Sequence, residues 1–393
     1  MKKLLIASAA LAMVAGTAQA QSSVTVYGVL DIGVSEVKNE TTAHSTGETA
    51  TAKISNTGNG DGSLATSRLG FRGTEDLGQG RKANFQLEYD LTDAGTGSTR
   101  GDGSTASLTS GSTFANFGAR YSWVGLEDAK MGQLRLGQQE TTMHSVYTAG
   151  LAGAANNAIG SVYSAHDTVN SISNNSATIR PYSVFVSRAV TYISPVVSGI
   201  RFEVQSANYS TSGANGAVAD IRNSLNAASL KYSAGKLNLA AAVQTSKSDS
   251  SATANDVTTR DTNALSANYN FGKVRAFGVY STDKVTQFNG VTRDTKATEL
   301  GLQLPVGKTT FWASAFDGDR KGTGLNTPAT NPTGLENRNA DVSGYQVGLR
   351  NDLSKRTAIY AIYGKQEIKG AAAENNKAKV ESTGMSVGVR HSF

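Results

Sequence analysis

The sequence of 393 residues contains no cysteine and only four histidines. Without cysteine there is no disulfide scaffold, no thiolate nucleophile and no cysteine-ligated zinc or iron–sulfur cluster. The histidines are His44, His144, His166 and His391, and none has the HExxH or paired spacing of a metal site. We therefore expect neither a metal nor another cofactor.

Proline and charge are also scarce, with 5 prolines and 17% charged residues beside 42 glycines. Average globular domains have roughly 25% charged residues, and neither a collagen-like nor a proline-rich disordered chain has this composition. After the N-terminus no apolar run reaches the roughly 18 residues that a transmembrane helix needs. A membrane protein with this sequence would have to be built of β-strands, because backbone polar groups in lipid need partners.

The N-terminus has the three parts of a secretory signal peptide. Met1-Lys2-Lys3 is basic, Leu4 to Gly16 is apolar but too short to span a bilayer, and Ala18-Gln19-Ala20 is a cleavage motif. We expect residues 1–20 to be removed between Ala20 and Gln21. Residues 21–393 would then form one exported domain.

Side-chain character alternates with period two in many segments. In 82–91 the residues Phe85, Leu87 and Tyr89 alternate with Gln86 and Glu88, which indicates a strand with one apolar and one polar face. Sixteen such segments are predicted: 24–34, 64–74, 81–92, 113–126, 132–139, 184–194, 200–209, 224–233, 236–246, 261–271, 274–282, 296–304, 309–317, 341–351, 357–367 and 381–393. Arg188 and Arg275 interrupt the alternation in two of them.

The predicted strands are joined alternately by short and long connections. The long ones are 35–63, 92–112, 140–183, 210–223, 247–260, 283–295, 318–340 and 368–380. An even number of strands with short turns at one end and long loops at the other is typical of an outer-membrane barrel. A soluble β-sandwich also alternates, but export, the absence of cysteine, the loop asymmetry and the aromatic C-terminal strand favour the barrel.

Motifs along the whole mature chain resemble the general, non-specific porins of Gram-negative bacteria, particularly the β-proteobacterial type. They are Ser22-Ser23-Val24-Thr25-Val26-Tyr27-Gly28-Val29-Leu30-Asp31-Ile32-Gly33-Val34, Ser67-Arg68-Leu69-Gly70-Phe71-Arg72-Gly73-Thr74-Glu75-Asp76-Leu77-Gly78-Gln79-Gly80, Leu134-Arg135-Leu136-Gly137-Gln138-Gln139, Val190-Thr191-Tyr192-Ile193-Ser194-Pro195, Leu353-Ser354-Lys355-Arg356-Thr357 and Gly388-Val389-Arg390-His391-Ser392-Phe393.

This resemblance implies a homotrimer of 16-stranded antiparallel transmembrane β-barrels in the outer membrane lipid. Each would be a water-filled pore, with short periplasmic turns, long extracellular loops and an inward-folded third loop, about 140–183. Two features differ from the family pattern. The family commonly has Gly-Arg-Gln where this chain has Gly137-Gln138-Gln139, and the third loop lacks a Pro-Glu-Phe-Gly-Gly run.

Alternation also predicts which charges face the pore. An arginine at the lipid midplane costs about 2–4 kcal/mol, so strand arginines belong inside. The expected pore and constriction residues are Arg68, Arg72, Arg120, Arg135, Glu140 and Asp167, with Asp31, Glu88, Arg201 and Lys231 as further lumen charges. Their balance predicts a weak anion preference, because rings of charge bias permeation by sign.

Aromatic residues are expected to form girdles on the outer face, where lipid meets water. The candidates are Phe71, Tyr89, Tyr121, Trp123, Tyr192, Tyr232, Tyr269 and Tyr345. The resemblance gives Phe393 a further role, because the C-terminal aromatic residue of the family is a signal for barrel assembly.

Other motifs are incomplete. The stretch from Gly301 to Lys308 has the wrong glycine spacing for a phosphate-binding loop, residues 56–62 lack the closing glutamate of a calcium loop, and no basic patch supports nucleic-acid binding. We predict a passive channel for small hydrophilic solutes and ions, with no catalytic residues. The alternatives are a substrate-selective channel for phosphate or an organic acid, and with less support a barrel enzyme or an adhesin.

Overall fold

The structure is a computed structural model. It describes residues 23–42, 49–58, 63–91, 119–154, 160–162, 184–211, 221–250, 256–286, 290, 292–323, 339–371 and 377–393. The expected signal peptide, Met1 to Ala20, and the cleavage site before Gln21 lie outside these ranges.

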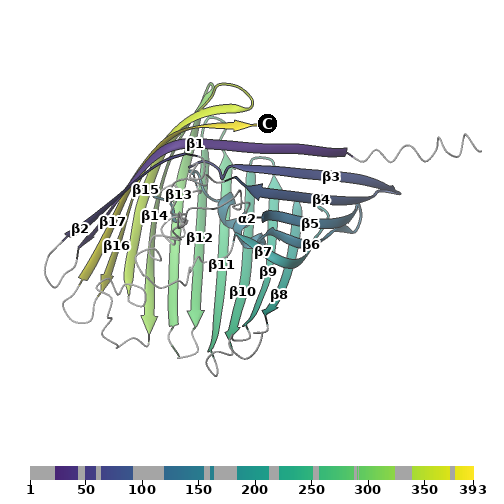
Figure 1. The fold of residues 1–393 in the computed structure, drawn as a ribbon, viewed down its shortest axis with the longest axis horizontal. Helices are drawn as coiled ribbons and strands as arrows, with labels where there is room; N and C mark the ends of the chain where they lie inside the picture. The colour runs from purple at the N-terminus through teal and green to yellow at the C-terminus, as the bar shows by residue number, and fades with distance from the viewer. Residues whose placement is uncertain are drawn as a thin grey trace, which may run out of the picture.

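Antiparallel strands form one closed sheet around a lumen (Figure 1). They are β1 (Ser23–Thr42), β2 (Thr49–Gly58), β3 (Arg68–Gly78), β4 (Arg81–Asp90), β5 (Ala119–Asp128), β6 (Gly132–Glu140), β7 (Phe185–Ile193), β8 (Ile200–Thr211), β9 (Ile221–Ala234), β10 (Leu237–Ser250), β11 (Asp256–Asn270), β12 (Arg275–Thr286), β13 (Thr292–Val306), β14 (Thr309–Thr323), β15 (Ala340–Asp352), β16 (Thr357–Ala371) and β17 (Lys377–Ser392). The ring closes where β1 pairs with β17 from Val29↔Ser392 to Thr42↔Lys379.

The barrel wall is sixteen strands around, because β2 and β3 pair with successive parts of β1 and together count as one strand of the wall. The first part of β1 pairs with β3 from Ser23↔Thr74 to Val29↔Arg68, and its second part pairs with β2 from Gly33↔Gly58 to Thr42↔Thr49. The predicted sixteen-stranded antiparallel barrel is therefore confirmed.

The predicted loop at 35–63 is wrong over much of its length, because β1 continues to Thr42 and β2 covers Thr49–Gly58. Several other strands likewise run beyond their predicted ends, among them β10, β11, β13 and β14. These extensions are polar on both faces, so they carry no hydrophobic period, but their backbones still pair in register. Of the predicted strand 113–126, the described part begins at Ala119.

The barrel is apolar on its outer face along the strands. On β13, Leu300 and Leu302 are 66% and 54% exposed, whereas Glu299, the residue before Leu300, is 1% exposed on the inner face. A strand turns successive side chains to opposite faces, so the exposed leucines form the surface that lipid covers.

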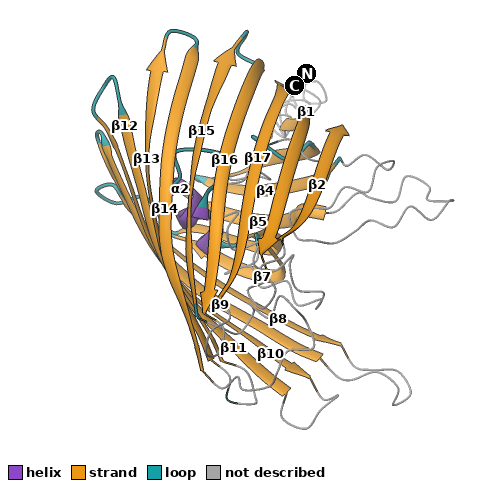
Figure 2. Cartoon of the chain, turned by 90° about the vertical axis from the view of Figure 1, so that its left-hand side faces the viewer, coloured by secondary structure: helices purple, strands orange, loops and turns teal. Residues whose placement is uncertain are grey.

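A short helix, α2 (Thr142–Ala149), lies inside the barrel (Figure 2). The hydroxyl of Thr141 caps it by accepting a hydrogen bond from the His144 backbone N–H (3.2 Å). Met143, Val146 and Tyr147 have no exposed surface and pack with Ala242, Ala264 and Val279 of β10, β11 and β12. The described start of the third loop therefore lines one inner wall. Within the described residues, no helix has the length and apolar character to cross a membrane.

Candidate permeation site in the barrel lumen

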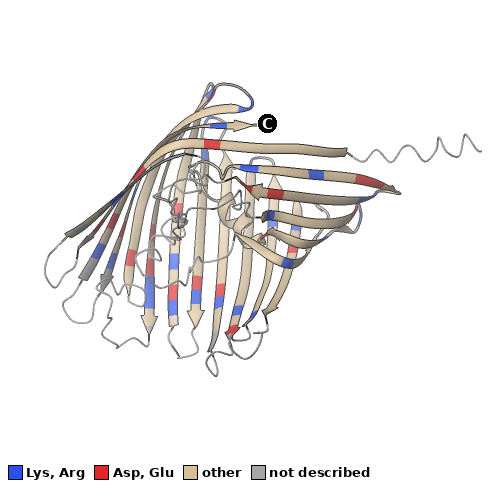
Figure 3. Ribbon diagram, in the orientation of Figure 1, with Lys and Arg blue, Asp and Glu red and all other residues tan. Residues whose placement is uncertain are grey.

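The inner faces of β3 and β4 bring basic and acidic side chains together. Arg68 is paired across the strands with Asp90, Gly70 with Glu88, and Arg72 with Gln86. Directly paired residues in an antiparallel sheet share a face, so both arginines and both carboxylates lie on the inner wall. Figure 3 shows basic and acidic segments on β3 to β6 and a separate group on the lower parts of β12 to β14.

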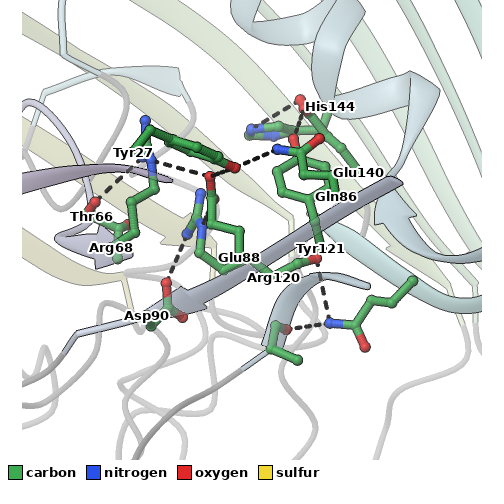
Figure 4. A network of polar contacts seen from close by, with 12 residues as sticks. Tyr27, Thr66, Arg68, Gln86, Glu88, Asp90, Arg120, Tyr121, Glu140 and His144 are labelled. Carbon is green, nitrogen blue, oxygen red and sulfur yellow. Dashed lines mark hydrogen bonds and ion pairs between the residues drawn. The ribbon is translucent and has the colours of Figure 1, made fainter. Parts of the chain in front are cut away.

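Glu88 is the centre of a polar network on this wall (Figure 4). Its side chain is 4% exposed, and its carboxylate accepts hydrogen bonds from Arg120 Nε (2.7 Å) and the Tyr27 hydroxyl (2.8 Å). Arg68 Nε lies 3.6 Å from the same carboxylate, and Arg120 also reaches Asp90 Oδ1 at 3.0 Å. The charges of Arg68 and Arg120 are thus largely balanced by Glu88 and Asp90.

A β-bulge explains how Arg120 and its neighbour both reach the lumen. Glu88 pairs with Tyr121 and Tyr89 pairs with Ala119, so Arg120 is an extra residue in β5. The prediction that Tyr121 and Trp123 face outward is wrong. Val124 is 56% exposed on the outer face, whereas Trp123 is 8% exposed beneath the guanidinium of Arg135.

Arg135 of β6 stacks on Trp123 with 4.3 Å between its Cζ atom and the ring centroid. Its Nε donates to Gln133 Oε1 at 2.8 Å. The outward positions on either side of it are Leu134 and Leu136, which are 43% and 48% exposed. A stacked guanidinium keeps its full charge while its flat face is covered.

Glu140 lies where β6 leads into α2. Its carboxylate accepts from the Tyr121 hydroxyl at 2.7 Å and lies 3.8 Å from His144 Nε2. These contacts fix the start of the third loop against β5. The other expected loop acid, Asp167, lies outside the described residues.

A second charged cluster lies beside α2 on β8 and β9. Glu203 Oε1 is 3.0 Å from both Arg201 and Lys231, and Glu203 Oε2 accepts from the Thr142 hydroxyl at 2.9 Å. Lys231 also donates to Ser145 of the helix at 2.8 Å. A cavity of ≈ 570 Å³ runs past this cluster to Arg135 and Glu140.

Asp31 faces inward but does not contribute an accessible lumen charge, contrary to expectation. Its side chain is completely buried and accepts hydrogen bonds from the Tyr360 hydroxyl (2.7 Å) and from the backbone N–H groups of Leu64 (3.1 Å) and Ala65 (2.7 Å). The carboxylate thus holds the inward-folded segment 63–67 against β1 and β16.

The sequence prediction missed basic residues on the opposite inner wall. Arg260 of β11 makes a two-pronged ion pair with Asp283 of β12, at 2.6 and 2.7 Å, and Arg293 and Arg320 are buried on β13 and β14. All four lie in segments predicted to be loops. The sequence could have predicted these residues from cross-strand pairing only if the polar ends of β11 to β14 had been recognised as paired strand.

Of the expected girdle, Tyr269 and Tyr345 are 38% and 42% exposed on the outer face. Phe393, the last residue, pairs with Gly28 of β1. Its N–H donates to the Gly28 carbonyl, and the Gly28 N–H donates to the Phe393 carbonyl, both at 3.1 Å. Its ring lies so close to Gly28 that a Cβ atom there would overlap it. The C-terminal residue therefore helps to close the sheet.

A model of the Gram-negative porin family matches residues 7–371. The chain belongs to this family. The porin is 30% identical to an outer membrane porin protein of Bordetella pertussis over 431 residues, and 30% identical to outer membrane porin protein 32 of Delftia acidovorans over 417 residues; each match covers 100% of both chains.

Solved outer membrane proteins share its fold. The porin superposes on the anion-selective porin from Comamonas acidovorans with a TM-score of 0.59, covering 95% of its own chain and 100% of the other at 23% identity. It superposes on the trimer form of OmpT of Vibrio cholerae with a TM-score of 0.60 at 13% identity, covering 95% and 99%. The porin is a passive channel of the Gram-negative outer membrane, and the matched proteins are channels rather than enzymes.

Proposed function

We propose that this porin passes small hydrophilic solutes and ions with a weak preference for anions. The supporting observation is the charge of Arg72 and Arg135. In the described part of the chain, neither guanidinium has a carboxylate oxygen within 4.0 Å, whereas Arg68, Arg120, Arg201 and Lys231 all face Glu88 or Glu203. The wall beside the third loop therefore keeps a positive excess.

The reversal potential across a planar bilayer with a salt gradient tests this proposal. One unit charge about 8 Å from an ion in water changes its energy by about 0.5 kcal/mol, or about two-fold in relative permeability. We expect anion preference in the wild type and no shift in Lys308→Gln, which removes a charge at a turn. Arg72→Gln with Arg135→Gln removes two charges and should shift the permeability ratio toward cations by about twice this energy, or about five-fold. Cation selectivity in the wild type would refute the proposal.

The same channels distinguish general diffusion from substrate selection. We expect flux that rises linearly with concentration for many small solutes. Flux that saturates with one anion, such as phosphate or an organic acid, would instead support the substrate-selective alternative. The anion preference should also weaken as salt rises, because the screening length is about 8 Å at 0.15 M and about 3 Å at 1 M.

We propose further that the porin is a homotrimer. β6 and β7 have only 9 residues and β4 and β5 have 10, whereas β13, β14 and β16 have 15. About 9–11 residues are needed just to span the bilayer, so a neighbouring copy would cover the low part of the wall. Light scattering in detergent should give three chains per particle; a single-chain particle with full channel activity would refute this.

Export requires the leader to be removed, and we propose cleavage between Ala20 and Gln21. The mass of the protein purified from outer membranes should correspond to a chain that begins at Gln21. A chain that retains Met1 would contradict the proposed signal peptide.

A further inference from the structure

A second piece of the chain lies inside the barrel besides the third loop. Residues 63–67 come between β2 and β3, and Ser63 and Ser67 are buried against the inner wall. The Ser67 carbonyl accepts from the Leu91 N–H at 2.8 Å, and the chain then continues directly into β3. We call residues 63–67 the inner strap.

The inner strap is held by one carboxylate and one hydroxyl of the wall. Asp31 Oδ2 accepts from the backbone N–H groups of Leu64 (3.1 Å) and Ala65 (2.7 Å). Asp31 Oδ1 accepts from the Tyr360 hydroxyl (2.7 Å), and the same hydroxyl accepts from the Ser63 N–H (3.2 Å). Two side chains of the wall thus fix three successive N–H groups of the strap.

Two glycines leave room for Tyr360 to reach Asp31 across the wall. Tyr360 on β16 is paired with Gly388 on β17, and Gly388 is paired with Gly33 on β1. A Cβ atom at Gly388 would overlap the tyrosine side chain, and one at Gly33 would lie 3.0 Å from its hydroxyl oxygen. The tyrosine therefore crosses β17 in a space that a larger residue would fill.

The inner strap and the third loop meet on the same part of the wall. Leu64 of the strap packs against a cluster formed by Ala154 of the third loop with Trp312, Tyr360 and Ile362 of β14 and β16. The two inward pieces therefore share one apolar contact, although they lie about 90 residues apart in the chain.

Together the two pieces line the inner wall from β10 round to β1. In the third loop, α2 packs on β10 to β12, and Gln303 of β13 and Gln346 of β15 donate to the carbonyls of residues 152 and 154, at 2.7 and 3.1 Å. The strap continues this lining along β16, β17 and β1, where the Ser63 hydroxyl donates to that of Ser386 at 2.6 Å. It ends beside the charged wall, because Arg68 donates to the carbonyl of residue 66 at 3.3 Å (Figure 4).

We propose that the inner strap is a second narrowing element of the pore, and that Asp31 and Tyr360 are positioning residues that set the largest solute able to pass. The third loop narrows the lumen along β10 to β15 and the strap narrows it along β16 to β1, so solutes pass between these two pieces and the charged wall of β3 to β6. The proposal concerns solute size and not the sign of charge. It goes beyond the anion preference, and either can fail without the other.

Flux of neutral sugars into liposomes that contain the porin tests this proposal, with a monosaccharide and a trisaccharide as probes. Tyr360→Phe removes the hydroxyl bonded to Asp31 and Ser63 and leaves both partners unpaired in a buried site. Since one lost hydrogen bond shifts a conformational equilibrium about five-fold, we expect the strap to leave the wall and the ratio of trisaccharide to monosaccharide flux to rise about two-fold or more. Tyr363→Phe, which removes an outer-face hydroxyl from the same strand, should leave the ratio unchanged. A ratio in Tyr360→Phe equal to or below that of the wild type would overturn the proposal.

A crosslink distinguishes a displaced strap from a weakened barrel. The chain has no cysteine, so Ser63→Cys with Ser386→Cys supplies a single possible disulfide, at two hydroxyls that lie 2.6 Å apart. With these two substitutions added to Tyr360→Phe, the oxidised channel should have the flux ratio of the wild type, and reduction inside the liposomes should raise it. The oxidised chain also supplies folded channels if Tyr360→Phe alone does not fold. A flux ratio that stays the same on reduction, with the disulfide and its loss verified by mass spectrometry, would overturn the proposal.

Discussion

The most constrained charge in the lumen is Glu88, because three groups from three strands share its carboxylate. Arg120, Tyr27 and Arg68 all lie within 3.6 Å of it. Replacing it with glutamine keeps the shape but removes the charge that balances the two arginines. We expect Glu88→Gln to increase the anion preference by about two-fold in permeability ratio, since one charge is worth about 0.5 kcal/mol at about 8 Å in water. The reversal potential measures the change.

The matched control for Glu88→Gln is Glu75→Gln, which removes the same charge from an exposed position beside the turn after β3. It should leave the reversal potential unchanged. If the two variants shift it equally, the effect comes from the overall charge of the protein and the assignment of Glu88 to the permeation path is wrong.

At the scale of single residues, alternation is informative wherever a strand is regular. It places Arg68, Arg72 and Arg135 on the inner face. In the structure Arg68 lies beside Glu88, Arg72 stacks on Tyr27 and Arg135 stacks on Trp123. It fails at Tyr121, because one bulged residue reverses the faces beyond it. It also cannot show that Asp31 is buried under residues 63–67, which is a contact between distant parts of the chain.

Strands as elements were predictable where they cross the bilayer, because lipid outside and water inside impose a period of two. Beyond the bilayer both faces are wet, and this constraint disappears. The ends of β11 to β14 therefore look like loops in the sequence although their backbones are paired. The inner-wall pair Arg260–Asp283 was missed for this reason.

The third loop is attached to the far wall at Gly160, and this attachment can be tested. Gly160 has φ +95, and a Cβ atom there would overlap the carbonyl oxygen of Tyr345 on β15. We expect Gly160→Ala to push the loop off the wall, to change single-channel conductance and to lower the unfolding temperature by several degrees. Single-channel recordings measure the conductance. The temperature at which the gel band of the folded barrel moves to the position of the unfolded chain measures the unfolding temperature.

Gly272 provides the control for backbone strain alone. It has φ +101 in the turn after β11, and no atom lies within 4 Å of the position that an added methyl group would take. Gly272→Ala therefore carries only the conformational cost of about 1–2 kcal/mol and should leave conductance unchanged. Equal effects of the two substitutions would show that strain, and not the contact with Tyr345, accounts for the result.

For the whole molecule, low hydrophobicity and membrane insertion are compatible because the barrel is apolar on the outside only. The chain is 38% hydrophobic, and residues such as Leu300 and Val387 are exposed while polar residues such as Gln346 and Gln366 are buried inside. The buried glutamines have a structural role: Gln346 accepts from the Ala154 N–H at 2.8 Å and so holds the third loop. Polar contacts thus act together with the apolar packing of Met143, Val146 and Tyr147 in holding the third loop inside the barrel.

Closure of the ring depends on its last residue, and deletion of Phe393 tests this at the scale of the whole molecule. The deletion removes two backbone hydrogen bonds to Gly28, each worth about 1 kcal/mol, and a ring that covers Gly28. We expect a lower yield of folded barrel but normal conductance in the channels that do form, because Phe393 lies outside the lumen. Phe271→Ala, which removes another exposed outward ring (64% exposed) without touching the seam between β1 and β17, should fold like the wild type. Equal folding yields for the wild type and the deletion would show that the remaining pairs of β1 and β17 suffice to close the barrel.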